Sequence, residues 1–166
     1  LVALGALASG PALAGPFAPA AGQPGSTAIA KTNGAISGWA TQVVSYQPAS
    51  GVDAAWRDPA KALGAAVGDA FDIVSLGNKG SITLSFGGTL YDGPGWDFAV
   101  FENSFNPTFL EFAFVEVSSN GSTFVRFPAF SLTPGPVGGF GAVDPTNVDG
   151  LAGKYQAGYG TPFDLG

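Results

Sequence analysis

The feature that most constrains the fold is a series of four strand-like segments within residues 81–127. Residues 81–86 alternate polar and apolar side chains, which is the period of a strand with one buried face. Further candidate strands follow at residues 96–103, 111–118 and 123–127. No helical period lies between the four segments. We therefore expect them to form one antiparallel sheet, which the rest of the chain covers with a second layer.

Turn signals separate these segments. Residues 92–95 (DGPG) precede the second one, and Asn120-Gly121 joins the third to the fourth. Asn-Gly between two strand-like runs strongly indicates a hairpin, because both residues tolerate positive φ. Residues 78–80 (NKG) predict another hairpin, between a short strand at residues 72–77 and the segment that begins at Ser81.

Outside this region the pattern is looser. Residues 38–46 predict a strand, and residues 56–64 predict one helical turn with Pro59 at its first position. Residues 128–141 are rich in Pro, Gly and Phe and predict a long loop. No closing strand follows, so we expect an all-β, antiparallel fold that is truncated at its C-terminus.

Composition narrows the possible functions. The 166 residues fit one domain, and the abundance of Gly (26) and Pro (13) favours an all-β chain. A net charge of −6 with only six Lys and Arg argues against nucleic acid as a partner. Without Cys or His, the chain has no catalytic Ser-His-Asp or Cys-His arrangement and no ordinary zinc site. A bound metal would have oxygen ligands, which favours Ca²⁺ or Mg²⁺.

The first residues have the character of an export signal. Residues 1–14 are apolar and end in Ala12-Leu13-Ala14, the small-x-small form of a signal peptidase site. The alternative is an ordinary buried segment. The run is too short to span a membrane, so we expect no direct membrane insertion. We predict a signal-peptide remnant (1–14), a flexible leader (15–28) and a β-sandwich domain (29–166) of a secreted protein.

Several motifs occur together in a familiar order. They are residues 58–64 (DPAKALG), 74–84 (VSLGNKGSITL), 95–103 (GWDFAVFEN), 112–121 (FAFVEVSSNG), and 151–154 (LAGK) with 160–165 (GTPFDL). In these motifs the chain resembles a family of secreted bacterial cell-surface proteins, many of which end in a PEP-CTERM sorting signal. The resemblance implies a galactose-binding-like jelly-roll β-sandwich. Asn120 departs from the family, which often has Asp there, and no sorting signal stands in this sequence.

The few carboxylates suggest one metal site. Glu102 falls on an inward position of the 96–103 segment, where an unpaired carboxylate would be costly. We predict a structural Ca²⁺ held by Glu102 and Asn103, with Glu116 or Asp97 as a further ligand. The alternative is solvated carboxylates at a strand edge, with an Asn that closes a turn. Residues 144–150 form a second oxygen-rich cluster, for which a run of Asx-turns is the favoured interpretation.

Two further sets of residues bear on function. Tyr91, Tyr155 and Tyr159 lie in Gly-rich loops, where their rings can stack on sugar faces or plug the ends of the sandwich. Glu102 and Glu116 are expected on adjacent antiparallel strands, which leaves an acid-pair glycosidase as an alternative. The scarce cations Arg126 and Lys154 are expected to pair with nearby acids.

The sequence thus favours a non-catalytic module that binds an extracellular glycan or matrix polymer. The first alternative is a purely structural or adhesive surface-layer protein without a small ligand. The second, less favoured, is a glycoside hydrolase.

Overall fold

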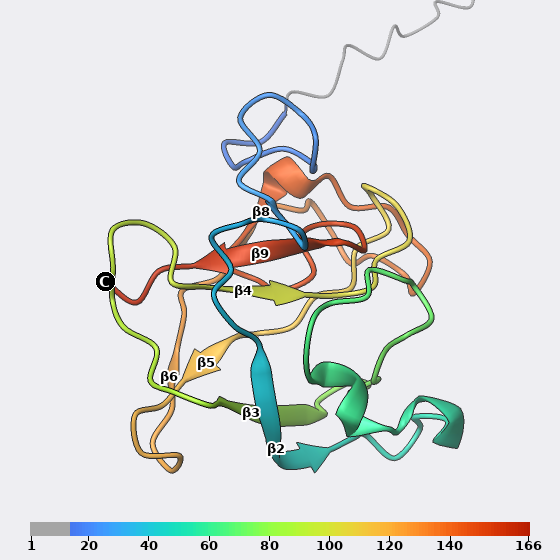
Figure 1. Ribbon diagram of the computed structural model, residues 1–166. Helices are drawn as coiled ribbons and strands as arrows, with labels where there is room; N and C mark the ends of the chain where they lie inside the picture. The colour runs from blue at the N-terminus through green and yellow to red at the C-terminus, as the bar shows by residue number, and fades with distance from the viewer. Residues whose placement is uncertain (1–13) are drawn as a thin grey trace, which may run out of the picture.

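The structure is a computed structural model that describes residues 14–166 (Figure 1). The predicted signal-peptide remnant therefore lies outside the described residues, except for Ala14. The strands are β1 (Ile29–Ala30), β2 (Ala40–Gln47), β3 (Ser81–Phe86), β4 (Phe98–Phe101), β5 (Glu116–Val117), β6 (Val125–Arg126), β7 (Phe130–Ser131), β8 (Val148–Asp149) and β9 (Tyr159–Phe163). The short 3₁₀ turns are η1 (Ala54–Trp56), η2 (Pro59–Ala62) and η3 (Pro145–Asn147). The chain is all-β, as predicted.

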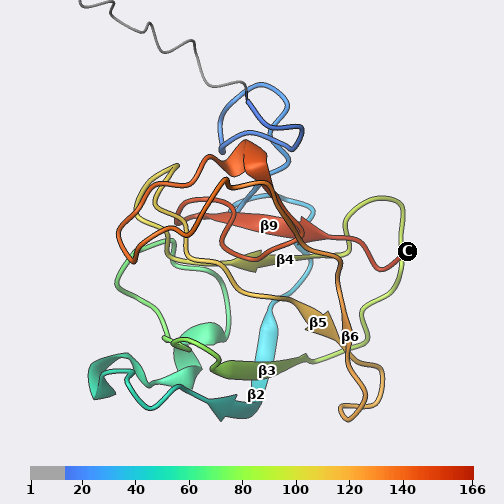
Figure 2. The ribbon, with the colours of Figure 1, turned by 180° about the vertical axis from the view of Figure 1, so that it is seen from behind.

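All strand pairs are antiparallel, and they form four small sheets. β9 lies between β1 and β4, while β2 pairs with β3, β5 with β6, and β7 with β8. The β2–β3 pair lies at the bottom of the molecule and the β4–β9 pair at mid-height, with β5 and β6 between them toward one side (Figures 1 and 2). No helix within residues 14–166 has the length and apolar character to cross a membrane.

The predicted single sheet over residues 81–127 is wrong. β3 pairs with β2, and β4 pairs with β9, so their partners come from opposite ends of the chain. The β4–β9 pairing places Phe98 opposite Phe163, and their rings stack with centroids 5.3 Å apart. Cross-strand aromatic pairs of this kind stabilise a particular register. The partner of a strand is thus chosen by packing, which adjacency in the sequence does not reveal.

The local predictions fare better. β3 coincides with the predicted strand at residues 81–86, and the predicted antiparallel pairing around Asn120-Gly121 is present as β5–β6, joined by the loop of residues 118–124. Gly121 has φ +71°, which an Asn-Gly turn supplies without strain. The predicted helical turn is η2, with Pro59 at its start. Residues 72–77 form no strand, so the predicted hairpin at residues 78–80 is wrong.

Two groups of buried and half-buried side chains form the interior. Leu110, Val143 and Val148 pack together, with Leu151 against them. The rings of Phe98, Phe127 and Phe163 form an aromatic cluster with centroids 5.0–5.7 Å apart. Both groups draw on the C-terminal third of the chain, which therefore organises the core.

The segment predicted as a flexible leader contacts the domain. Gly15 donates its N–H to the Thr146 hydroxyl at 2.6 Å, and Phe17 donates its N–H to the Thr146 carbonyl at 3.1 Å. The Phe17 ring stacks on Phe130, with centroids 6.1 Å apart. Residues 15–17 are thus held by hydrogen bonds and ring packing, and β1 at Ile29 then joins the β9 sheet.

Candidate functional site

A pocket of about 330 Å³ opens beside β9, and we call it the Lys154 pocket. Its lining combines a cation, carboxylates, hydroxyls and apolar rings. The lining residues are Thr27, Phe127, Pro128, Asp149, Gly150, Lys154, Thr161, Pro162, Phe163 and Asp164. Most of them come from the segment after β6, from the end of β8 and the residues after it, or from β9. The pocket therefore forms only when these segments pack together.

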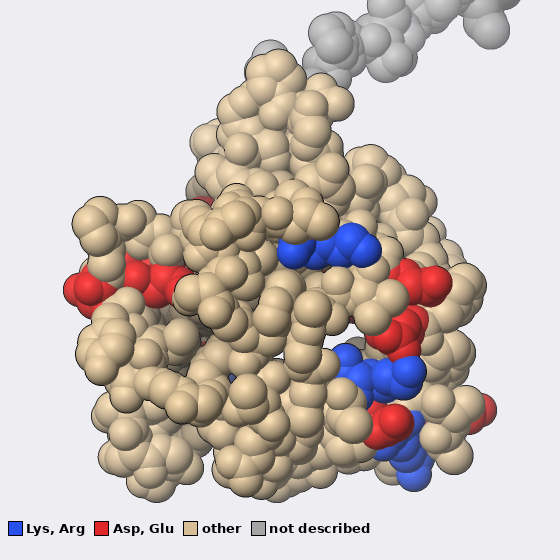
Figure 3. All heavy atoms as spheres, in the orientation of Figure 1, with Lys and Arg blue, Asp and Glu red and all other residues tan. Residues whose placement is uncertain are grey.

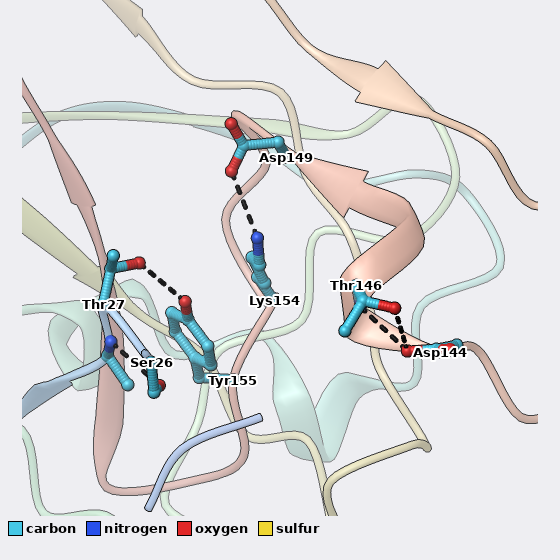
Figure 4. Close-up of polar contacts among 8 residues, drawn as sticks. Ser26, Thr27, Asp144, Thr146, Asp149, Lys154 and Tyr155 are labelled. Atoms are coloured by element: carbon cyan, nitrogen blue, oxygen red, sulfur yellow. Dashed lines mark hydrogen bonds and ion pairs between the residues drawn. The ribbon is translucent and has the colours of Figure 1, made fainter. Parts of the chain in front are cut away.

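Lys154 is the central charge of this pocket. Its side chain is only 1% exposed, and its ammonium donates to Asp149 Oδ1 at 3.1 Å (Figure 4). The Asp149 side chain is 50% exposed, so the pair reaches from the interior to the surface. Pairing of Lys154 and of Arg126 with nearby acids is confirmed. A buried ammonium is costly without partners, which explains why Asp149 lies beside it.

Tyr155 is buried beside Lys154, which agrees with the alternative of an interior ring and not with an exposed sugar-stacking ring. It is 1% exposed, and its hydroxyl and the Thr27 hydroxyl are hydrogen bonded at 2.8 Å (Figure 4). Tyr159 is half-buried on β9, and only Tyr91 is well exposed, at 79%. The three predicted sugar-stacking tyrosines therefore differ in setting, and Tyr155 offers no free face.

Thr161 lines the pocket and also carries an unusual buried group. It lies on β9 between Gly160 and Pro162 and is 4% exposed. Its Oγ1 is the only buried side-chain oxygen or nitrogen within residues 14–166 that has no hydrogen-bond partner. Buried hydroxyls are normally paired, because an unmade hydrogen bond costs free energy.

The four predicted calcium ligands lie in separate settings. Asp97 accepts the N–H groups of Gly93 and Leu165, each at 2.7 Å, and Glu116 pairs with Arg126 at 2.8 Å. The expected adjacency of the strands carrying Glu102 and Glu116 is wrong, because β4 pairs with β9 and β5 pairs with β6.

Asn103 connects two segments instead of closing a simple turn. Its side-chain amide donates to the Ala70 carbonyl at 2.8 Å, and the residue is 9% exposed. This bond ties the chain before Phe71 to the loop that follows β4.

Glu102 is buried within its own turn. Its Oε2 accepts hydrogen bonds from the backbone N–H and the hydroxyl of Ser104, both at 2.9 Å. Burial is the largest influence on this carboxyl and raises its pKa above the ordinary value, although the bonds from Ser104 oppose the shift. The cost predicted from the sequence for an inward Glu102 is thus partly offset by Ser104.

We expect Glu102→Gln to stabilise the protein at neutral pH. The folded state holds the Glu102 proton more tightly than the unfolded state, so this residue lowers the free energy of unfolding as pH rises through its raised pKa. The amide oxygen of Gln can still accept from Ser104. In thermal melts we expect the variant to have a higher melting temperature than the wild type at pH 7. The difference in melting temperature should disappear near pH 4. Glu116→Gln, on an exposed ion pair, is the control. A gap that widens toward low pH would contradict the interpretation.

One group of acids within residues 14–166 is close enough to share an ion. The carboxylates of Asp92, Asp97 and Asp164 offer oxygens within 4.8 Å of one another. Acidic side chains gather at the left edge of Figure 3, on the side where the C-terminus lies in Figure 1. Asp97 is the one predicted ligand in this trio. Calcium binding stays a prediction.

The second cluster predicted from the sequence is an Asx-turn, as favoured. Asp144 caps η3, and its Oδ1 accepts from the Thr146 N–H at 2.9 Å and from the Thr146 hydroxyl at 2.7 Å (Figure 4). Asp149, in the same stretch, forms an ion pair with Lys154.

A row of phenylalanine rings forms a second candidate surface, which we call the phenylalanine row. Consecutive ring centroids lie 6.1, 5.1 and 6.1 Å apart along Phe71, Phe105, Phe109 and Phe140. Phe140 is 94% exposed, Phe71 is 69% exposed and Phe105 is 53% exposed. Apolar rings gathered at a surface in this way mark a site of interaction.

The loops that carry this row are fixed to the core. Val143 donates its N–H to the Thr108 carbonyl at 2.8 Å, which joins the two loops that hold Phe109 and Phe140. Leu110, next to Phe109, packs in the core against Val143. The row is thus carried on anchored segments, which lie on the same side of the molecule in Figures 1 and 2.

The fold and these surfaces define an all-β protein with an aromatic row and a mixed polar and aromatic pocket. Comparisons of the chain with family models, curated proteins and solved structures found no match. The resemblance to secreted bacterial cell-surface proteins stays a prediction. Sequence reasoning missed both surfaces, although the density of Phe in residues 98–140 was a signal for the row.

Proposed function

We propose that this protein is a secreted, non-catalytic β-sandwich module that binds an extracellular glycan along the phenylalanine row. The observation that carries the proposal is the contiguous, exposed set of rings Phe71, Phe105 and Phe140 on either side of Phe109. The antiparallel sheets support a sandwich, and we propose the galactose-binding-like jelly roll as its full form.

The chemistry of the row favours a neutral polymer. Residues 103–110 and 136–143, which hold Phe105, Phe109 and Phe140, contain no charged side chain. Phe71, the fourth ring, lies between Asp69 and Asp72, so the uncharged part of the row is the part best suited to the apolar C–H faces of sugars. Several rings in line can also engage successive units of one chain, which raises the affinity above that of a single contact.

The placement of the acids supports a non-catalytic role. Glu102 is engaged by Ser104, and Glu116 by Arg126, and neither lines the Lys154 pocket. The glycosidase alternative predicts turnover of a chromogenic glycoside that Glu102→Gln abolishes. The structural or adhesive alternative predicts no retention by any polysaccharide.

Affinity gel electrophoresis through neutral polysaccharides tests the proposal. We expect the wild type to be retarded, and Phe140→Ala and Phe105→Ala each to weaken binding about fivefold or more, because ring truncation at a contact centre costs on the order of 1 kcal/mol or more. Phe114→Ala is the matched control, since Phe114 is 61% exposed but lies outside the row, under Arg126. Equal retardation of all variants would refute the role of the row.

A further inference from the structure

We infer that Asn103 is the positioning residue that holds Phe71 in the phenylalanine row, so that the row engages a glycan as one continuous surface. The inference rests on the proposed function in one respect, because it takes the row to be the binding surface. It is carried by a hydrogen bond between two segments that are far apart in the sequence: the Asn103 side-chain amide donates to the Ala70 carbonyl at 2.8 Å.

Asn103 is held in place by the residues on either side of it. Phe101, two residues before it, pairs with Gly160 on β9. Ser104, directly after it, is fully buried, and its carbonyl accepts the N–H of Ala157 at 2.9 Å. Asn103 is itself only 9% exposed. Its side-chain amide is therefore attached to a fixed part of the fold.

The segment that carries Phe71 has few attachments of its own. None of residues 65–74 belongs to a strand, and within the described part of the chain no backbone–backbone hydrogen bond joins them to another segment. Side chains supply the three hydrogen bonds that do so among residues 14–166: Lys31 with the Val67 carbonyl, Lys61 with Asp72, and Asn103 with the Ala70 carbonyl.

The bond from Asn103 is the least exposed of these three attachments. The side chains of Lys61 and Asp72 are 45% and 29% exposed, and the bond from Lys31 also lies at the surface. Exposed ion pairs contribute little, because water competes for both partners. A hydrogen bond shielded from water constrains its partners more strongly, because breaking it leaves polar groups unpaired. We therefore expect the position of residues 70 and 71 to depend mainly on Asn103.

This bond sets the distance between two rings of the row. Ala70 directly precedes Phe71 in the sequence. Asn103 lies two residues before Phe105, so a single bond joins the bases of both rings, whose centroids are 6.1 Å apart. Phe71 is 69% exposed, so the rest of the protein covers little of its ring. Without the bond, Phe71 would leave the row, and a glycan would meet three rings in place of four.

A double-mutant cycle on retention by neutral polysaccharides tests the inference. We expect Asn103→Ala and Phe71→Ala each to weaken retention about threefold or more, because each removes one ring from the contact. The double variant should lose no more than Phe71→Ala alone, since Asn103 acts through that ring. Lys61→Ala cuts the exposed ion pair on the same segment and is the matched control, which should stay within about twofold of the wild type. Asn103→Leu lacks the donor but fills the space, so it keeps the test valid if Asn103→Ala does not fold.

Ring contacts in the glycan-free protein separate this inference from the proposed function. Nuclear Overhauser effects between the rings of Phe71 and Phe105 should be present in the wild type and lost in Asn103→Ala. If they are lost while no polysaccharide retains even the wild type, Asn103 positions Phe71 but the row is not a glycan surface. Persistence of these effects in Asn103→Ala, wild-type retention of that variant, additive losses in the double variant, or an equal loss in Lys61→Ala would each overturn the inference.

Discussion

Gly153→Ala is expected to destabilise the protein by on the order of 4 kcal/mol, enough to remove much of the stability of a domain this size. Gly153 has φ +80°, a conformation that side chains rarely adopt. A Cβ at this position would lie 1.7 Å from the Glu111 carbonyl oxygen, far inside van der Waals contact. The neighbouring bridge between Ala113 and Ala152 holds the two segments at this separation, so backbone has to move.

Urea unfolding measures this effect, with Gly158→Ala as the matched control. Gly158 has a similar φ of +87°, but a Cβ there meets nothing within 4 Å. We expect the control to cost only about 1–2 kcal/mol, from backbone strain alone. Equal losses for the two variants would show that the close approach of Glu111 to Gly153 is wrong.

Phe163→Ala is the second large effect, with an expected loss of about 3–5 kcal/mol. Phe163 is 5% exposed on the central strand β9, and its ring packs against Phe98 at 5.3 Å and Phe127 at 5.0 Å. Truncation would leave a cavity between two rings that cannot fully collapse, and it would also remove one wall of the Lys154 pocket.

Phe140→Ala provides the contrast in the same urea series. Its ring is 94% exposed, so we expect a change within about 0.5 kcal/mol of zero. Glycan retention should respond in the opposite order, with Phe140→Ala losing binding while it stays folded. A large loss of stability in Phe140→Ala would mean that this ring stabilises the fold. Phe140 would then no longer count as part of the proposed binding surface.

The features of the candidate site that could be predicted followed from the small number of Lys and Arg residues and from local side-chain chemistry. With six Lys and Arg in the chain, the pairing of Lys154 and Arg126 with acids could be expected. The burial of Lys154 could not, because its ammonium lies near the ring of Phe17, which comes from the other end of the chain. Asn103 shows the same limit: an amide that reads as an ion ligand or turn residue instead holds residue 70.

The sequence by itself determined the local structure of this protein: the strand at residues 81–86, the Asn120-Gly121 hairpin, the turn at Pro59 and the all-β class. These features depend on side-chain period and backbone preference over a few residues, so they can be predicted from the sequence without the tertiary structure. The tertiary structure decided which strands pair, because β4 selects β9 through the packing of Phe98 on Phe163. It also decided that Tyr155 is interior while Phe140 is exposed, since burial depends on what the remainder of the chain places over each ring.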